Sequence, residues 1–362
     1  MRRLRTALLL AVLAAVIVGV GVYRISWHPP KHLAVAPFCQ GNPASLVPGQ
    51  GLKVMTWNVQ YLAGKRYVFW YERPGARAAD ERPTPADLAH GLDEVARVVR
   101  EENPDVLLLQ EVDNQARASY YQDQLALLRE RLADLYPCSA QAYEFKAAFV
   151  PRWHLLGRVG RTVATFSRYR IERAERLQLP LPGNALTQLF APRPALLSSY
   201  LNVADGSLFA VLNTQLGRYH AGSDTQRNQL VALRGRLDRL ESQGTPWLLG
   251  GDFNALPLGR YRRLEPSLQP YYAPDSDLHL LWERYPMVPS NAQAGGLQRG
   301  QWLTYFANGS HGNGPDRTLD YFFHSPQLAQ LDARVRQEDT LGISDHLPLL
   351  ISITLPKTDT KR

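Results

Sequence analysis

WLLGGDFN, residues 247–254, is the stretch that decides how this chain folds. Its first three residues form an apolar strand, and a strand that is apolar on both faces belongs inside a layered α/β domain. The strand leads directly to Asp252 and Asn254, which are two residues apart and should share a face. Gly250 and Gly251 leave room for neighbouring backbone to approach. The stretch therefore predicts a buried strand that delivers polar groups to the edge of a sheet.

Strands and helices of similar style alternate along most of the chain. Helices are predicted over 84–103, where Thr84, Pro85 and Asp87 form an N-terminal cap, and over 122–135 and 225–241. Strands are predicted over 52–57, 106–109, 162–167, 196–201, 208–216, 319–323 and 347–355. Strands outnumber helices and need cover on both faces, which favours two stacked sheets flanked by helices. The Gly-rich stretch 290–317 is too long for an ordinary connection and is expected to be a functional surface loop.

The N-terminus predicts a membrane anchor. Three arginines in residues 1–5 precede the uncharged run 6–23, and Arg24 closes it. This length is at the lower edge of what spans a bilayer, and the leading arginines would stay in the cytoplasm. We expect a cytoplasmic segment (1–5), a transmembrane signal anchor (6–24), a linker rich in Pro and Gly (25–50), one catalytic domain (51–356) and a tail (357–362). The alternative is a cleaved signal peptide, and both place the domain outside the cytoplasm, in the periplasm or the extracellular space.

The cysteines and the charge fit an exported protein with anionic partners. Cys39 and Cys138 are the two cysteines, and an even count in an exported protein suggests a disulfide, although two unrelated buried thiols are the alternative. The formal net charge of +8 favours phosphate esters, nucleic acid or anionic lipid head groups without choosing among them. The chain is expected to be a monomer.

Polar residues recur where apolar strands end. The residues concerned are Asn58 (TWN), Glu111 (VLLLQE), Gln215 (VLNTQ), Asp252 and Asn254 (GGDFN), Asp320 (TLDYFF), and Asp345 and His346 (ISDHLPL). A carboxylate placed at the end of an apolar strand costs desolvation unless a cation or donor meets it. Oxygen ligands without a Cys/His cluster indicate Mg²⁺ or Mn²⁺, with Ca²⁺ as an alternative, rather than structural zinc. A histidine that acts on a phosphate needs a carboxylate partner, for which Asp320 is the candidate.

The set TWN, QE, GGDFN, LDY and SDHLP resembles the endonuclease/exonuclease/phosphatase superfamily of metal-dependent phosphodiesterases, in order and spacing, over about residues 50–355. The resemblance implies a four-layer α/β sandwich of two mainly antiparallel sheets flanked by helices. It also implies roles, in which Glu111, Asp345 and Asn58 bind the metal and Asp252 orients or deprotonates the attacking water. Asn254 would hold a phosphate oxygen. His346, paired with Asp320, would contact the phosphate and balance its charge.

Two positions depart from the pattern of many relatives. Gln215 stands where many have histidine, and an amide can donate a hydrogen bond to phosphate but cannot become a cation or a general acid. Gln60 stands where some have a metal-binding carboxylate and should share the face of Asn58, so one tightly held metal is expected rather than two. Arg161, directly before a predicted strand, is a candidate for substrate binding.

These features predict an extracytoplasmic hydrolase of phosphate esters that acts by in-line attack of water at phosphorus. Membrane anchoring favours a phospholipid or a small phosphorylated metabolite as substrate. The alternatives are an anchored nuclease acting on DNA or RNA, and a non-catalytic binding module on the same fold. The aromatic run Tyr61, Tyr67, Phe69, Trp70 and Tyr71 can face a membrane or a substrate, although packing against the sheet is the preferred interpretation.

Overall fold

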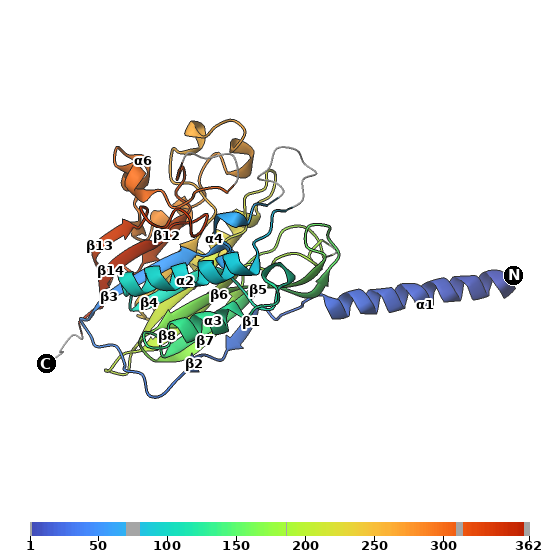
Figure 1. The fold of residues 1–362 in the computed structure, drawn as a ribbon, viewed down its shortest axis with the longest axis horizontal. Coiled ribbons are helices and arrows are strands. Elements are labelled where there is room, and N and C mark those ends of the chain that lie inside the picture. The colour runs from blue at the N-terminus through green and yellow to red at the C-terminus, as the bar shows by residue number, and fades with distance from the viewer. Residues whose placement is uncertain (1, 70–79, 186, 309–313, 358–362) are drawn as a thin grey trace.

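The computed structural model describes residues 2–69, 80–185, 187–308 and 314–357, and it contains two stacked sheets of seven strands each (Figure 1). In spatial order, sheet A consists of β1 (His32–Val35), β7 (Ile171–Gln178), β8 (Ala195–Asn202), β9 (Leu208–Gln215), β10 (Trp247–Asp252), β12 (Asp320–His324) and β11 (Met287–Val288). Sheet B consists of β13 (Ala329–Val335), β14 (Leu349–Thr354), β3 (Gly51–Asn58), β4 (Val106–Asp113), β6 (Gly157–Ser167), β5 (Cys138–Val150) and β2 (Phe38–Cys39). The β3–β4 and β9–β10 pairs are parallel and the other pairs of neighbours are antiparallel, which confirms the predicted architecture.

The structure describes six α-helices, which are α1 (Arg2–Ile25), α2 (Pro85–Glu102), α3 (Gln124–Arg131), α4 (Thr225–Ser242), α5 (His279–Trp282) and α6 (Asn291–Gly295). Of these, α2, α3, α4 and α5 form the two outer layers, whereas α1 projects away from the domain (Figure 1). Apolar side chains of α2 and α3 pack on the outer face of sheet B, and those of α4 and α5 on the outer face of sheet A. The start of α2 is the predicted capping box, because Thr84 accepts a hydrogen bond from the Asp87 backbone and Asp87 accepts one from the Thr84 backbone.

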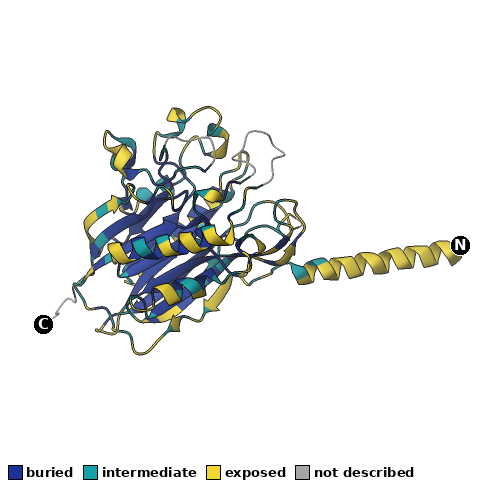
Figure 2. Cartoon of the chain, viewed as in Figure 1, coloured by how far each residue is buried: buried dark blue, intermediate teal, exposed yellow. Residues whose placement is uncertain are grey.

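Alternation along the strands divides the core into three layers. In β3, Val54 faces the space between the sheets, whereas Met55 faces α2. In β10, Leu248 points inward and Leu249 points toward α4. The central strands are therefore buried on both faces, as the dark strands in Figure 2 show, and this explains their nearly continuous apolar sequences.

The two glycines of WLLGGDFN are required by close packing. A Cβ at Gly250 would lie 2.5 Å from the Phe322 ring, and one at Gly251 would lie 1.9 Å from the Thr214 carbonyl oxygen. Gly251 also has φ +152°, which side chains rarely allow. Glycine at these positions thus lets β10 sit tightly between β9 and β12 just before Asp252.

The N-terminal segment is bound to the domain soon after α1. This helix is long and apolar enough to cross a membrane, and none of its residues is buried. The expected linker 25–50 carries β1 and β2, which pair with β7 and β5, and Leu46, which is fully buried. The predicted disulfide joins Cys39 to Cys138 between β2 and β5. Two short stretches of this Pro- and Gly-rich segment therefore form an edge strand of each sheet.

Several elements differ from the sequence prediction. The strands β5, β7 and β13, which contain many exposed or charged residues, were not predicted. The helix predicted over 122–135 is shorter in the structure, where α3 ends at Arg131. The Gly-rich stretch 290–317 contains α6 and a turn that pairs Tyr305 with Arg317 and His346, so it is partly ordered against the sheet. Residues 309–313 of that stretch lie outside the described residues.

Candidate active site

The ends of five strands bring the predicted polar residues to one edge of the sandwich. Asp252 at the end of β10 is in register with Gln215 on β9 and with Asp320 on β12. Across the gap between the sheets, the Asn58 amide of β3 donates a hydrogen bond to the Asp252 carboxylate at 3.2 Å. A connected network joins Asn58, Glu111, Gln215, Asp252, Asn254, Asp320 and His346.

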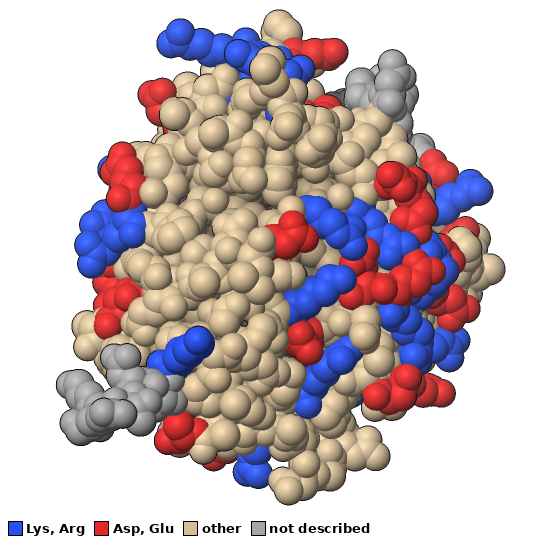
Figure 3. Space-filling view, turned by 90° about the vertical axis from the view of Figure 1, so that its left-hand side faces the viewer, with Lys and Arg blue, Asp and Glu red and all other residues tan. Residues whose placement is uncertain are grey.

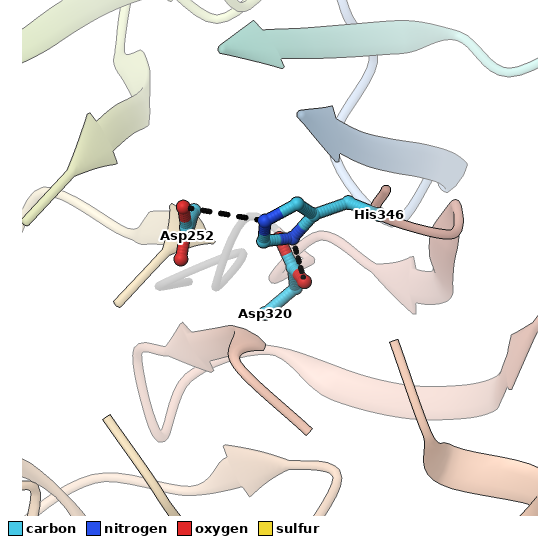
Figure 4. Close-up of side chains that lie close together, drawn as sticks. All are labelled: Asp252, Asp320 and His346. Carbon is cyan, nitrogen blue, oxygen red and sulfur yellow. Dashed lines mark hydrogen bonds and ion pairs between the residues drawn. The ribbon is translucent and has the colours of Figure 1, made fainter. Parts of the chain in front are cut away.

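His346 lies between two carboxylates (Figure 4). Its Nδ1 is 2.8 Å from an Asp320 oxygen, and its Nε2 is 3.7 Å from an Asp252 oxygen. Burial by itself lowers the pKa of His346, but Asp320 and Asp252 outweigh burial and raise the pKa to about 10. The two carboxylates therefore favour the protonated imidazole. The Trp57 indole donates a hydrogen bond to the His346 carbonyl at 2.8 Å and fixes the backbone there.

Asp252 is the hub of the network. It accepts hydrogen bonds from the side chain of Asn58, from Gln215, and from both the backbone (2.9 Å) and the side chain (3.2 Å) of Asn254. Burial raises the pKa of Asp252 to about 6; His346 opposes this rise and Asp320 adds to it. A carboxylate whose pKa is close to neutral is suited to exchange a proton with water.

Gln215 links the hub to Glu111. Its amide nitrogen is 2.7 Å from the Glu111 carboxylate and 3.1 Å from Asp252, so it donates toward two acids. Its amide oxygen is buried without a hydrogen-bond partner among the described residues. The Arg161 guanidinium lies 3.7 Å from Glu111 and 3.7 Å from Glu144, which places this substrate candidate next to the network.

Asp345 lies beside this network and is held by its backbone. Its N–H donates to the Gln60 side-chain oxygen at 3.3 Å, and its carbonyl accepts from the Phe306 N–H at 2.6 Å. Burial raises the pKa of the Asp345 carboxyl, and the nearby His346 partly offsets this rise. The prediction that Gln60 shares the face of Asn58 is wrong, because β3 ends at Asn58 and Gln60 has φ +41° in a turn. There, Gln60 binds the Asn308 amide and the Tyr67 carbonyl and so joins two loops.

Backbone strain coincides with the network. Glu111 has φ +56° at a bulge where the β4–β6 register shifts, and Asn254 has φ +48°. Positive φ is costly for residues with side chains and occurs mainly where the surrounding structure enforces it. The turn at Asn254, rather than a continued strand, brings its amide back to Asp252 and to the Leu216 carbonyl at 3.0 Å.

The donor set fits a hard divalent cation. One atom each from Asp252, Asp320 and His346 lie within 4.8 Å of one another, close enough for a metal. However, His346 is already hydrogen-bonded to Asp320, and its positive charge opposes a second cation there. The ligands predicted from the sequence, Glu111, Asp345 and Asn58, carry oxygen atoms of the kind that Mg²⁺ and Mn²⁺ prefer.

A pocket of about 100 Å³ adjoins Asn254 and contains residues that the sequence did not single out. Its lining includes Tyr271, Tyr272, Tyr305 and Arg317. The Arg317 guanidinium donates to the Tyr272 hydroxyl at 2.9 Å and lies over the Tyr305 ring. The Tyr305 ring packs edge-on against His346, 4.9 Å between centroids. These residues follow no strand-end pattern, so only the folded crossover between β10 and β12 reveals them.

The described rings of the aromatic run, Tyr61, Tyr67 and Phe69, lie near Arg161. The Phe69 ring meets the rings of Tyr61 and Tyr67 edge-on, the two tyrosine rings are tilted against each other, and all three line a second pocket together with Arg161. This supports packing against the domain for these three rings. Trp70 and Tyr71 lie outside the described residues.

Comparisons with known proteins agree with this geometry. The model of the Endonuclease/Exonuclease/phosphatase family matches residues 55–346. No curated protein matches the chain.

Among solved structures, an endonuclease/exonuclease/phosphatase from Beutenbergia cavernae has 21% identity and a TM-score of 0.57, covering 85% of this chain and 72% of that one. The human Nocturnin catalytic domain with bound sulfate anion has 18% identity and a TM-score of 0.50, covering 88% and 97%. Danio rerio (D. rerio) TDP2 complexed with single strand DNA product has 14% identity and a TM-score of 0.51, covering 84% and 99%. At these identities the structural likeness shows the fold alone.

Proposed function

Because the chain belongs to the endonuclease/exonuclease/phosphatase family, whose members are generally divalent-metal-dependent hydrolases of phosphoester bonds, we propose that it is a metal-dependent hydrolase of a phosphate ester. We further propose that α1 anchors it in a membrane with the domain 51–356 outside the cytoplasm. The apolar helix and the Cys39–Cys138 disulfide support this location. The substrate class is a phospholipid or a small phosphorylated metabolite.

The proposed mechanism is in-line attack of water at phosphorus, in which a new P–O bond forms while the opposite P–O ester bond breaks, and the departing ester oxygen takes a proton from solvent water. Asp252, with a pKa of about 6, orients the water and accepts its proton. Protonated His346, held by Asp320, contacts a phosphate oxygen and balances the developing negative charge. When the substrate is bound, the Asn254 amide would donate a hydrogen bond to a second phosphate oxygen in place of its present bond to Asp252.

Glu111, Asp345 and Asn58 would hold the divalent ion, which supplies positive charge to the phosphate when bound. Gln215 keeps Glu111 and Asp252 at a fixed separation through its two hydrogen bonds. We also propose that Arg161, which lies 3.7 Å from Glu111, binds an anionic part of the substrate.

One observation carries the proposal: Asp252 lies 3.7 Å from His346 and is joined to Glu111 through Gln215, although the three are far apart in sequence. The test is hydrolysis of bis-p-nitrophenyl phosphate with Mg²⁺ or Mn²⁺ by the full chain and by Asp252→Ala. Turnover that needs the metal and is lost in the variant supports the proposal. Absence of turnover on a broad panel with every metal would favour a binding module instead.

A paired assay separates the substrate classes. Phospholipid vesicles and plasmid DNA are offered to the same preparation with the same metal. Preferential release of phosphate or headgroup from vesicles supports the proposed class, whereas preferential nicking of plasmid would make the chain an anchored nuclease.

A further inference from the structure

The tip of the β5–β6 hairpin, residues 146–158, exposes both apolar and cationic side chains. Phe149 is 42% exposed and Trp153 is 76% exposed. The exposed charged residues of the tip are Lys146, Arg152 and Arg158. No Asp or Glu occurs from residue 145 to residue 171, so acidic neighbours in sequence do not neutralise the tip. Exposed tryptophan beside lysine and arginine is the composition of segments that lie in a membrane interface.

A continuous set of ring contacts joins this hairpin to the end of α1. The Trp27 ring, two residues beyond α1, packs edge-on against Tyr143 of β5, 6.1 Å between centroids. The Lys146 ammonium lies 4.5 Å from the centre of the same Tyr143 ring. Arg176 of β7 lies over Trp27 at 4.9 Å and donates to the Tyr143 carbonyl at 2.8 Å. The hairpin therefore has a fixed position beside the helix, and Figure 1 shows α1 leaving the domain next to β5.

The opposite edge of sheet B has a different surface. Figure 3 shows that face, on which basic and acidic side chains are intermixed. Ion pairs there include Arg336 with Asp339 and Arg97 with Glu101, so positive charge is balanced locally. Leu331 on β13, at this edge, is also an exposed apolar side chain, with an exposed fraction of 66%. It therefore serves as the control position for the hairpin tip.

We propose that residues 146–158 are a second membrane contact, which docks on the lipid surface that α1 enters. Trp153 and Phe149 enter the interface, and Lys146, Arg152 and Arg158 attract anionic lipid head groups. The proposal rests on the membrane anchorage included in the proposed function, and not on hydrolysis. Its consequence for the site is direct, because Leu155 and Arg158 of the hairpin line the pocket that reaches Arg161 and Tyr61. Docking would hold that pocket at the bilayer surface.

The test uses the full chain in phosphatidylcholine nanodiscs without and with about one third phosphatidylglycerol. Both native cysteines are in the disulfide, so Trp153→Cys and Leu331→Cys each provide one thiol for a fluorescent label. Nitroxide lipid with its spin label in the upper acyl chain should quench the label at 153 at least twofold more than the label at 331. The anionic lipid should increase this difference, and Lys146→Glu with Arg152→Glu should remove it.

Equal quenching at the two positions, or quenching at 153 that ignores the charge reversal, would overturn the proposal. Hydrolysis of bis-p-nitrophenyl phosphate is measured on the same preparations. This soluble substrate should be turned over equally by the charge-reversed and unchanged proteins. If no preparation hydrolyses this substrate but the quenching at position 153 is as expected, the result would count against the proposed function and still support the docking surface.

Discussion

Gln215 holds two acids together where many relatives carry a histidine that can take a proton. Its nitrogen donates to Glu111 and Asp252, and its buried oxygen has no partner among the described residues. Because an amide is neutral, Gln215 adds no positive charge to this network. An imidazole at this position could accept and deliver a proton and become cationic.

We predict that Gln215→His raises turnover of a simple phosphodiester by about tenfold, toward the usual contribution of a positioned acid or base. Initial rates at saturating metal give the answer. Gln215→Asn, which keeps an amide but shortens its reach, is the control and should lower turnover. An unchanged or reduced rate in Gln215→His would refute a role for this position in proton transfer.

His346 depends on Asp320 for its charge. Burial favours the neutral ring, and the neighbouring carboxylates reverse that preference and raise its pKa to about 10. In Asp320→Asn the balance moves back toward burial, so the pKa of His346 should fall toward or below its ordinary value near 6.5. The cation would then be lost as pH rises through neutrality.

We therefore predict that Asp320→Asn loses about a hundredfold in kcat at pH 8 and less at pH 6. A pH–rate profile from 5.5 to 9 tests this sign. Asp316→Asn, which changes a nearby acid paired with Arg317, should keep the unmodified profile. A loss that is the same at every pH would mean that Asp320 does not act through the charge of His346.

At the scale of elements, the site depends on how closely β10 packs between its neighbours. We predict that Gly251→Ala costs about 3 kcal/mol or more in unfolding free energy, because its Cβ would overlap the Thr214 carbonyl. Gly235→Ala is the matched change, since Gly235 lies in α4 with open space around it and should gain up to about 1 kcal/mol. Urea unfolding of both variants measures the difference. Similar stabilities for the two variants would contradict the packing argument.

The elements that the sequence predicted best are those that are buried on both faces. Strands such as β10 and β4 have nearly continuous apolar sequences, and α2 has a complete capping box, so local signals and tertiary packing agree. In contrast, β7 and β13 lie toward sheet edges and mix charged with apolar residues. The pairing of β7 and β13 is set by the neighbouring strands rather than by their own periodicity. Such an influence of neighbouring strands cannot be seen in the local sequence.

The same division applies to the site. Asp252, Glu111 and Asn58 end or follow apolar strands, so the sequence placed them at a sheet edge before the structure joined them. The positive φ of Glu111, Gln60 and Asn254 is not predicted by strand periodicity, so the orientation of these three residues was known only from the structure. Tyr305 and Arg317 reach the site through the crossover between β10 and β12, so their place could be found only from the folded chain.

At the scale of the whole molecule, the disulfide closes a loop with a sequence separation of 99 and ties β2 to sheet B. We predict that Cys39→Ser with Cys138→Ser lowers the unfolding free energy by about 4–5 kcal/mol, the chain-entropy value for a loop of this size. Thermal unfolding with and without a reductant provides the measurement, and the reductant should have no effect on the variant. A double variant as stable as the natural protein would show that β2 is held without the bond.

The distance between α1 and β1 limits where this protein can work. Six residues, 26–31, separate Ile25 from His32, and Trp27 among them already packs on the domain. Even fully stretched, such a segment spans roughly 25 Å. If α1 crosses a bilayer, the domain stays within about its own diameter of the membrane surface. It then diffuses only in the plane of the membrane. It would then meet substrates according to their density per unit area, and molecules deeper in the surrounding medium would be cleaved only after they diffuse to that layer.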